Sequence, residues 1–479
     1  MDISEDFNLS LLVKHYHDQS NGGAGGKGGS NGSGGAGGDG GAGGTVTVTN
    51  HQQIRTTGSS NAAGIVAQSL GAIGGTGGAV GTVGTGGNGG VGGNSCLSHS
   101  TGSCIYGSKA SDGASGASGN VNPDAVVGSA SYVGGNGGNV TVTNHGAVET
   151  QGARSAAISA QSIGGVQGLA DFDPYAVNWD GLPSGAQQSS SGTVSITNSG
   201  ALTTTGDESV GLLALSQGSD GSSGNVTISS TGDISTSGDK SSAIIAKSSV
   251  LDVARAGAPD STGGTAGDVT ITHSGGDIVL GGADAAAVIA QSHSNAVATD
   301  TGDVSVTLAD AKITGSAKSS TGALVQASSI SEDGNAGDVT VENSADVECV
   351  ADDCVAFELA SNGKTPAENG NLSLTNSGTI EGGKGGSAVV LNGGKTNRVI
   401  NENSASGKQA TMRTKGGIND TIIKGSDGDD EIINRNGALL VGNLDLGAGI
   451  NSLTNGVGST YNSGNNIDLG GGTFTNNGT

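Results

Sequence analysis

Residues 139–144 read NVTVTN, and this stretch decides the fold because close copies of it recur along the chain. Apolar residues alternate with hydroxyl residues, which is typical of a strand that buries one face. In the first copy Val46 and Val48 would point into a core, and the threonines beside them would point out. The other copies are TVTVTN at 45–50, TVSITN at 193–198, NVTISS at 225–230, DVTITH at 268–273, DVSVTL at 303–308, DVTVEN at 338–343 and NLSLTN at 371–376.

Two more short strands are predicted after each copy. In the fourth unit they are DISTSG at 233–238 and SAIIAKS at 242–248, with third strands elsewhere at 62–69, 155–162 and 286–292. Gly, Asn, Asp and Ser occupy the joints, where turns need them. Three unlike strands in a repeated order predict an all-β chain, a parallel β-helix (β-solenoid) with glycine-rich loop insertions. One unit buries too little surface to fold alone, so the coils must stack.

Composition agrees with a thin, elongated core. Of 479 residues 94 are Gly, aromatics make up 2% and hydrophobics 33%. Disorder and a β-sandwich are the rival interpretations; regular repeats oppose the first, and scarce aromatics oppose the second. The net charge of −24 excludes a nucleic-acid partner and an anionic membrane surface, because both need clustered Lys and Arg. No apolar run approaches a transmembrane segment, and residues 1–6 are too acidic for a signal peptide.

We expect four regions. Residues 1–20 form an N-terminal segment with a single strand around 7–13, and residues 21–44 form a glycine-rich linker. Residues 45–392 form solenoid coils with a glycine-rich insertion at 71–138, and residues 393–479 form C-terminal coils with an acidic turn. Matches to GxGxxG inside the glycine tracts lack a strand–turn–helix context and arise from composition.

Residues 140–165 and 45–71 resemble the passenger regions of large glycine-rich bacterial autotransporters. The segments at 420–437, 442–455 and 464–478 are similar in style. The resemblance implies a right-handed β-helix, secreted through an outer-membrane pore and displayed on a Gram-negative cell surface. The family's C-terminal β-barrel and long export signal are not found, so we expect a fragment, a truncated reading frame or a relative exported by another route.

The function expected from this resemblance is structural or adhesive, with no catalysis and with a host or bacterial surface molecule as partner. A polysaccharide-cleaving, pectate-lyase-like β-helix is the alternative, but Asp352 and Asp353 fit solvated turns and Trp179 is the single Trp. No Gly-Asp-Ser-Gly protease turn occurs. An ice-binding solenoid is a further alternative: outward Thr would repeat at about 4.8 Å between coils and about 6.8 Å along strands. We expect Glu342 and Leu308 to interrupt that array.

One metal site is predicted. Residues 425–433, GSDGDDEII, match the calcium-binding nonapeptide at Gly425, Gly428, Asp430 and Ile432. Calcium needs about six oxygen ligands, which Asp427, Asp429 and Asp430 would supply with backbone carbonyls of stacked turns. Residues 419–423 align with 429–433 as a second such turn. An acidic turn without metal is the alternative, and no other cofactor is expected.

The four cysteines predict two local disulfides, Cys96–Cys104 and Cys349–Cys354. Seven and four residues separate the partners, and turn formers among them let the ends meet. A shared zinc ion lacks the usual C-x₂-C spacing, and free buried thiols would fit a reducing compartment. Five of the seven histidines, His15, His17, His51, His99 and His145, are interpreted as scattered turn residues.

Overall fold

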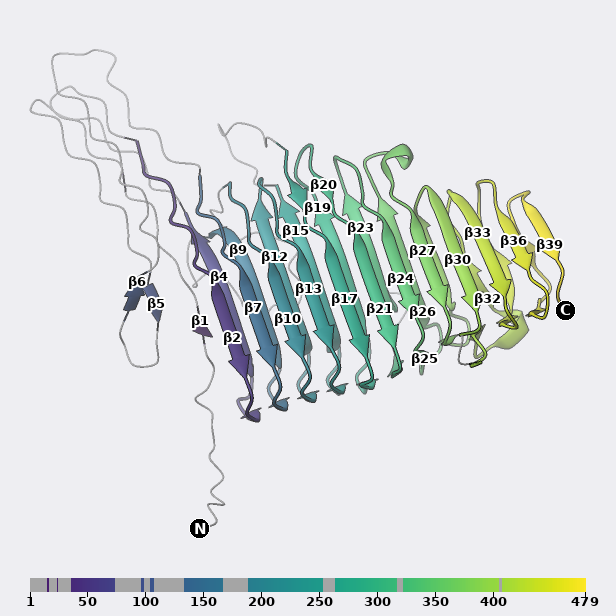
Figure 1. Ribbon diagram of the computed structural model, residues 1–479, viewed down its shortest axis with the longest axis horizontal. Coiled ribbons are helices and arrows are strands. Elements are labelled where there is room, and N and C mark those ends of the chain that lie inside the picture. Colours follow the sequence, from purple (N-terminus) through teal and green to yellow (C-terminus); the bar gives the residue numbers. More distant parts are fainter. Residues whose placement is uncertain are drawn as a thin grey trace, which may run out of the picture.

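The chain winds into a parallel β-helix, shown side-on in Figure 1. The computed structural model describes residues 15–16, 24, 36–73, 96–98, 104–106, 133–166, 188–252, 263–316, 322–404 and 407–479. Three parallel sheets of 12, 12 and 11 strands run along the rod, and each coil gives one strand to each. Within the described residues the helices are two 3-10 turns, Pro366–Glu368 and Gly417–Asn419. The predicted fold class is confirmed.

The first sheet contains all eight copies of the repeated segment, paired in parallel and in register, as predicted. Its strands are β2 (Val46–Asn50), β7 (Val140–Asn144), β10 (Val194–Asn198), β13 (Val226–Ser230), β17 (Val269–Ser274), β21 (Val304–Ala309), β24 (Val339–Asn343), β27 (Leu372–Asn376), β30 (Thr396–Glu402), β33 (Asp429–Arg435), β36 (Ser452–Asn455) and β39 (Thr473–Asn476).

The second sheet is built from the short middle strands of the coils. They are β3 (Ile54–Thr56), β8 (Val148–Thr150), β11 (Leu202–Thr204), β14 (Ile234–Thr236), β18 (Ile278–Leu280), β22 (Lys312–Gly315), β25 (Asp346–Cys349), β28 (Thr379–Gly382), β31 (Thr411–Thr414), β34 (Leu439–Val441) and β37 (Thr460–Asn462).

The third sheet closes each coil with a longer strand. Its members are β1 (His15–Tyr16), β4 (Ile65–Ala72), β9 (Ile158–Val166), β12 (Val210–Ser219), β15 (Ser242–Leu251), β19 (Val288–Ser294), β23 (Ala323–Ser331), β26 (Val355–Asn362), β29 (Val389–Gly393), β32 (Thr421–Lys424), β35 (Asn443–Asp445) and β38 (Ile467–Asp468). Two small pairs are β16 (Thr265–Ala266) with β20 (Asp300–Thr301), and β5 (Cys96–Ser98) with β6 (Cys104–Tyr106).

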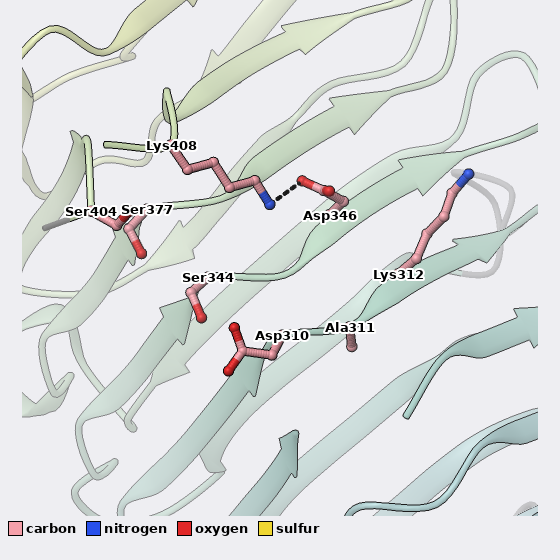
Figure 2. A pocket seen from close by; sticks show the side chains of 8 residues that line it. All are labelled: Asp310, Ala311, Lys312, Ser344, Asp346, Ser377, Ser404 and Lys408. Carbon is pink, nitrogen blue, oxygen red and sulfur yellow. Dashed lines mark ion pairs between the residues drawn. The ribbon is translucent and has the colours of Figure 1, made fainter. Parts of the chain in front are cut away.

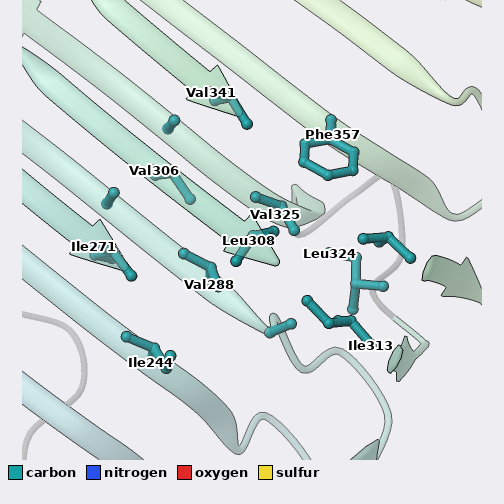
Figure 3. Close-up of a cluster of buried hydrophobic side chains, with 14 of the residues drawn as sticks. Ile244, Ile271, Val288, Val306, Leu308, Ile313, Leu324, Val325, Val341 and Phe357 are labelled. Atoms are coloured by element: carbon teal, nitrogen blue, oxygen red, sulfur yellow. The ribbon is translucent and has the colours of Figure 1, made fainter. Parts of the chain in front are cut away.

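One continuous apolar core fills the rod. Figure 3 shows inward side chains from neighbouring coils in rows, among them Val306, Leu308 and Phe357, all fully buried. Aliphatic residues dominate because three short strands enclose a narrow space. The third sheet departs from simple alternation, since Leu213 and Ile245 are also buried although they lie on its other face.

Asparagines that end first-sheet strands turn inward and bond from coil to coil. Nδ2 of Asn343 donates to Oδ1 of Asn376 at 2.8 Å, and Nδ2 of Asn376 donates to Oδ1 of Asn401 at 2.9 Å. The same bond continues through Asn434, Asn455 and Asn476, and a first run joins Asn50, Asn144 and Asn198. We call this column the asparagine ladder. Ser230, His273 and Leu308 separate its two runs.

A buried serine column fixes the corner between the third sheet and the following first-sheet strand. Ser216 Oγ donates to the carbonyl of Gly192 at 2.8 Å and accepts the Gly224 N–H at 2.9 Å. Ser248, Ser292, Ser329 and Ser361 repeat this pair of bonds. The glycines are required there, because a Cβ on Gly224 would lie 2.4 Å from the Gly192 carbonyl carbon.

Candidate functional site

The predicted calcium residues lie at a groove of about 660 Å³ beside the first sheet. Asp427 and Asp429 line it and are exposed, whereas Asp430 is buried behind it. Asp429 Oδ1 accepts the Ile450 N–H at 2.7 Å. The turn therefore presents two carboxylates to solvent and keeps the third for the interior.

Asp430 is held by groups of its own turn and of the preceding coil. Asn397 Nδ2 donates to Oδ1 at 2.7 Å, and the Ser426 N–H donates to Oδ2 at 3.0 Å. Burial raises the pKa of Asp430 to about 6, although these hydrogen bonds favour the anion. Both carboxylate oxygens thus already have protein donors.

The three aspartates do not converge on one point. Within the described ranges no group of three or more His, Cys, Asp or Glu side chains is placed to hold a metal ion. The two similar segments are also not stacked turns: Thr421–Lys424 belongs to the third sheet, whereas Asp429–Arg435 belongs to the first. Calcium binding at Asp427, Asp429 and Asp430 stays a prediction.

A disulfide joins Cys349 and Cys354 at the corner between β25 and β26. Their Cα atoms are 5.8 Å apart, and both residues are fully buried. Asp353 within this corner has a φ of 57°. The backbones of β5 and β6 pair antiparallel, but the side chains of Cys96 and Cys104 lie outside the described residues, so that disulfide remains a prediction.

A second groove, of about 540 Å³, lies at the joint between the first and second sheets. Figure 2 shows Asp310, Ser344, Asp346, Ser377 and Lys408 around it, with an ion pair of 2.8 Å between Lys408 and Asp346. Lys312, Ala311 and Ser404 complete the lining. Acids and bases therefore meet in one groove, as the polysaccharide-cleaving alternative requires.

The electrostatics of this groove favour binding over proton transfer. Burial acts to raise the pKa of Asp346, but hydrogen bonds from Lys408 and Thr379 outweigh it, and the net pKa is lowered. Lys312 lies 3.8 Å from Glu348, outside the groove. A carboxylate held as an anion by a neighbouring ammonium group is a poor general acid.

The outward Thr and Ser side chains of the first sheet form two straight columns. The expectation that Leu308 interrupts them is wrong: Leu308 pairs with His273 and Asn343 and is fully buried. It occupies an inward position in phase with Val304 and Val306, so the period-two alternation itself places it in the core and not in the outward array. Glu342 does lie in a column, opposite Thr307 and Thr375.

Sequence reasoning missed the asparagine ladder and the serine column. The signal was present, because Asn recurs at the end of TVTVTN, NVTVTN and TVSITN, and Ser recurs in the AQS of the third strands. Polar residues near strand ends are equally typical of turns, so the sequence alone does not mark them as buried. The predicted turn histidines His51 and His145 do stack, with ring centroids 4.9 Å apart.

Comparison with protein-family models, with curated proteins and with solved structures finds no match for this chain. Among the described residues, no helix has the length and apolar character needed to cross a bilayer.

Proposed function

We propose that the protein is a structural and adhesive solenoid displayed outside the cell, in the manner of an autotransporter passenger. The observation that carries this proposal is the architecture: sheets of 12, 12 and 11 strands form one rod that repeats its outward side chains coil by coil. A rod of this kind holds a contact surface away from its point of attachment. Multiple weak contacts along one rigid body add up to firm attachment.

The Cys349–Cys354 disulfide supports an extracellular location. Disulfides persist in oxidising compartments and are rare in a reducing cytosol. The acidic balance of the chain, 43 Asp and Glu against 19 Lys and Arg, supports a partner that is not a nucleic acid. The groove of Figure 2 supplies a polar contact site on the flank of the rod.

The proposal is tested in cells that produce the full-length protein. External protease and an antibody against the coils should reach it without permeabilisation, and purified residues 1–479 should compete with those cells for attachment to a surface. Protein that is protected until the cells are opened contradicts the location. Attachment unchanged by loss of the protein contradicts the adhesive role.

The polysaccharide-cleaving alternative is tested separately, because the Asp346–Lys408 groove gathers the required residue types. We expect no cleavage of pectin or other acidic polysaccharides by the purified chain. Turnover that disappears in Asp346→Asn but survives in Asp239→Asn, an exposed corner acid elsewhere, would establish an enzyme instead.

A further inference from the structure

The outer face of the first sheet from β2 to β27 is a regular array of hydroxyl groups. Two outward positions per strand align from coil to coil through the parallel register. Every position is Thr or Ser except Glu342. The first column is Thr47, Thr141, Ser195, Thr227, Thr270, Ser305, Thr340 and Ser373; the second is Thr49, Thr143, Thr197, Ser229, Thr272, Thr307, Glu342 and Thr375.

The hydroxyl groups of these two columns take no part in hydrogen bonds within the described protein. All of these side chains are exposed or half-buried, and within the described residues none of the hydroxyls bonds another protein group. The buried serines behave differently, since Ser216 and Ser248 are fully bonded. Each outward hydroxyl therefore offers one donor and two acceptors to whatever lies against the face.

The hydroxyl groups on this face are also evenly spaced. Figure 1 shows the first-sheet strands side by side in one even row along the rod. Successive coils in a parallel sheet lie about 4.8 Å apart, and alternate residues of one strand lie about 6.8 Å apart, so eight strands span about 34 Å. Hydroxyl groups thus form a two-dimensional lattice rather than a scattered polar surface.

We propose that this array binds ice. An ice surface is a periodic sheet of oxygen atoms that donate and accept hydrogen bonds, and a rigid hydroxyl lattice meets it without reordering side chains. Thr suits the purpose because its branched side chain is restricted at χ1, so little entropy is lost on binding. The proposal concerns a different ligand from the adhesive function and does not depend on it.

Charge and the lack of aromatics oppose other ligands for this face. Thr45, Asn139, Thr193 and Asn225 precede its first four strands, so that part carries no charge. Single-stranded nucleic acids and crystalline polysaccharides bind through aromatic platforms, which neither column contains. After β27 the array ends, because Arg398 and Glu431 take the same positions and pair at 3.0 Å.

The test compares two lysine variants from one coil. Thr227 on β13 and Ser235 on β14 are both exposed, but only Thr227 belongs to the array. The wild-type chain should lower the freezing temperature below the melting temperature in a concentration-dependent way and enter a slowly growing ice crystal. Thr227→Lys should lose both effects, because a long charged side chain holds the face away from ice. Ser235→Lys should keep both.

Thermal melting of both variants checks that the coils stay folded, and Thr227→Ser, which keeps the hydroxyl, should retain most activity. Wild-type protein that shows no thermal hysteresis and is excluded from ice overturns the proposal. So does equal activity of the two lysine variants. Retention on insoluble cellulose that requires Thr227, without ice affinity, assigns the face to a polysaccharide and overturns it too.

Discussion

Replacing Asn376 in the asparagine ladder should destabilise the coils around β27 strongly. Its Nδ2 donates to Asn401 Oδ1 at 2.9 Å, to the Gly378 carbonyl at 3.1 Å and to the Thr411 carbonyl at 3.3 Å. Its Oδ1 accepts the Asn343 Nδ2 at 2.8 Å and the Gly378 N–H at 3.2 Å. The side chain is fully buried, so no water replaces these partners.

The magnitude follows from the groups left behind. In Asn376→Ala the buried Oδ1 of Asn401 loses its hydrogen-bond donor, and the buried Nδ2 of Asn343 loses its side-chain acceptor. Each unsatisfied group costs about 1–3 kcal/mol. Asn343 keeps one bond, to the Ala345 carbonyl, which places its loss at the low end. Together with a small cavity, we expect a loss of about 3–5 kcal/mol in the free energy of unfolding.

Urea unfolding of purified protein measures this loss, and hydrogen exchange locates it in β27 and β30. Thr375→Ala is the matched control, since the neighbouring side chain points outward and should change stability by less than about 0.5 kcal/mol. Asn476→Ala at the exposed end of the ladder should cost about 1 kcal/mol. If Asn376→Ala is no worse than Thr375→Ala, the ladder does not stabilise the coils as argued.

Three other predictions concern titration, covalent linkage and metal. His273 is fully buried and desolvation lowers its pKa, despite the hydrogen bond to the Gly276 carbonyl and the facing Asp233 and Asp277. The neutral His273 side chain therefore contributes stability above pH 6.5, and this contribution is lost as the pH falls below 6.5 through the folded-state pKa. His273→Asn should flatten the stability–pH curve in this acidic range. A curve that the substitution leaves unchanged contradicts the assignment. Mass spectrometry of unreduced peptides should show the Cys349–Cys354 and Cys96–Cys104 disulfides. The double substitution Cys349→Ser with Cys354→Ser should lower the free energy of unfolding by about 2 kcal/mol. Four alkylatable thiols in protein recovered from the cell surface rule out both disulfides. Calorimetry at millimolar calcium should show heat that Asp427→Asn with Asp429→Asn removes, while no heat and no thermal stabilisation in the wild type dismiss the site.

Periodicity predicts much of this fold and little of its interior polar bonding. Alternation in NVTVTN placed Val140 and Val142 inside, and the repeated order of strands led to three parallel sheets. The alternation could not predict that Asn144 is buried and hydrogen-bonded. A period of two indicates which face a side chain takes, but not whether the neighbouring coil offers it a hydrogen-bond partner. Only the register, which puts Asn144 beside Asn198, makes a buried amide favourable.

The candidate sites were harder to predict, because they depend on contacts between distant residues. Asp430 and Asp427 are three positions apart, yet one is buried and the other lines a groove. Lys408 lies just before β31 and reaches Asp346 on β25 across the one intervening coil, and no local sequence motif predicts this contact. The Cys349–Cys354 corner is the exception, since a short loop of turn formers brings its own ends together.

The alignment of side chains between neighbouring coils does not depend on how many residues connect the coils. Gln68 and Gln161 are 93 positions apart in sequence and hydrogen-bond at 2.7 Å, whereas Asn434 and Asn455 are 21 positions apart and hydrogen-bond at 2.9 Å. Loop-closure entropy grows only with the logarithm of length, so the longer excursion costs about 1 kcal/mol more. Insertions at the corners are thus almost neutral for stability, and a lineage of such proteins can gain or shed appendages there while inheriting the same rod.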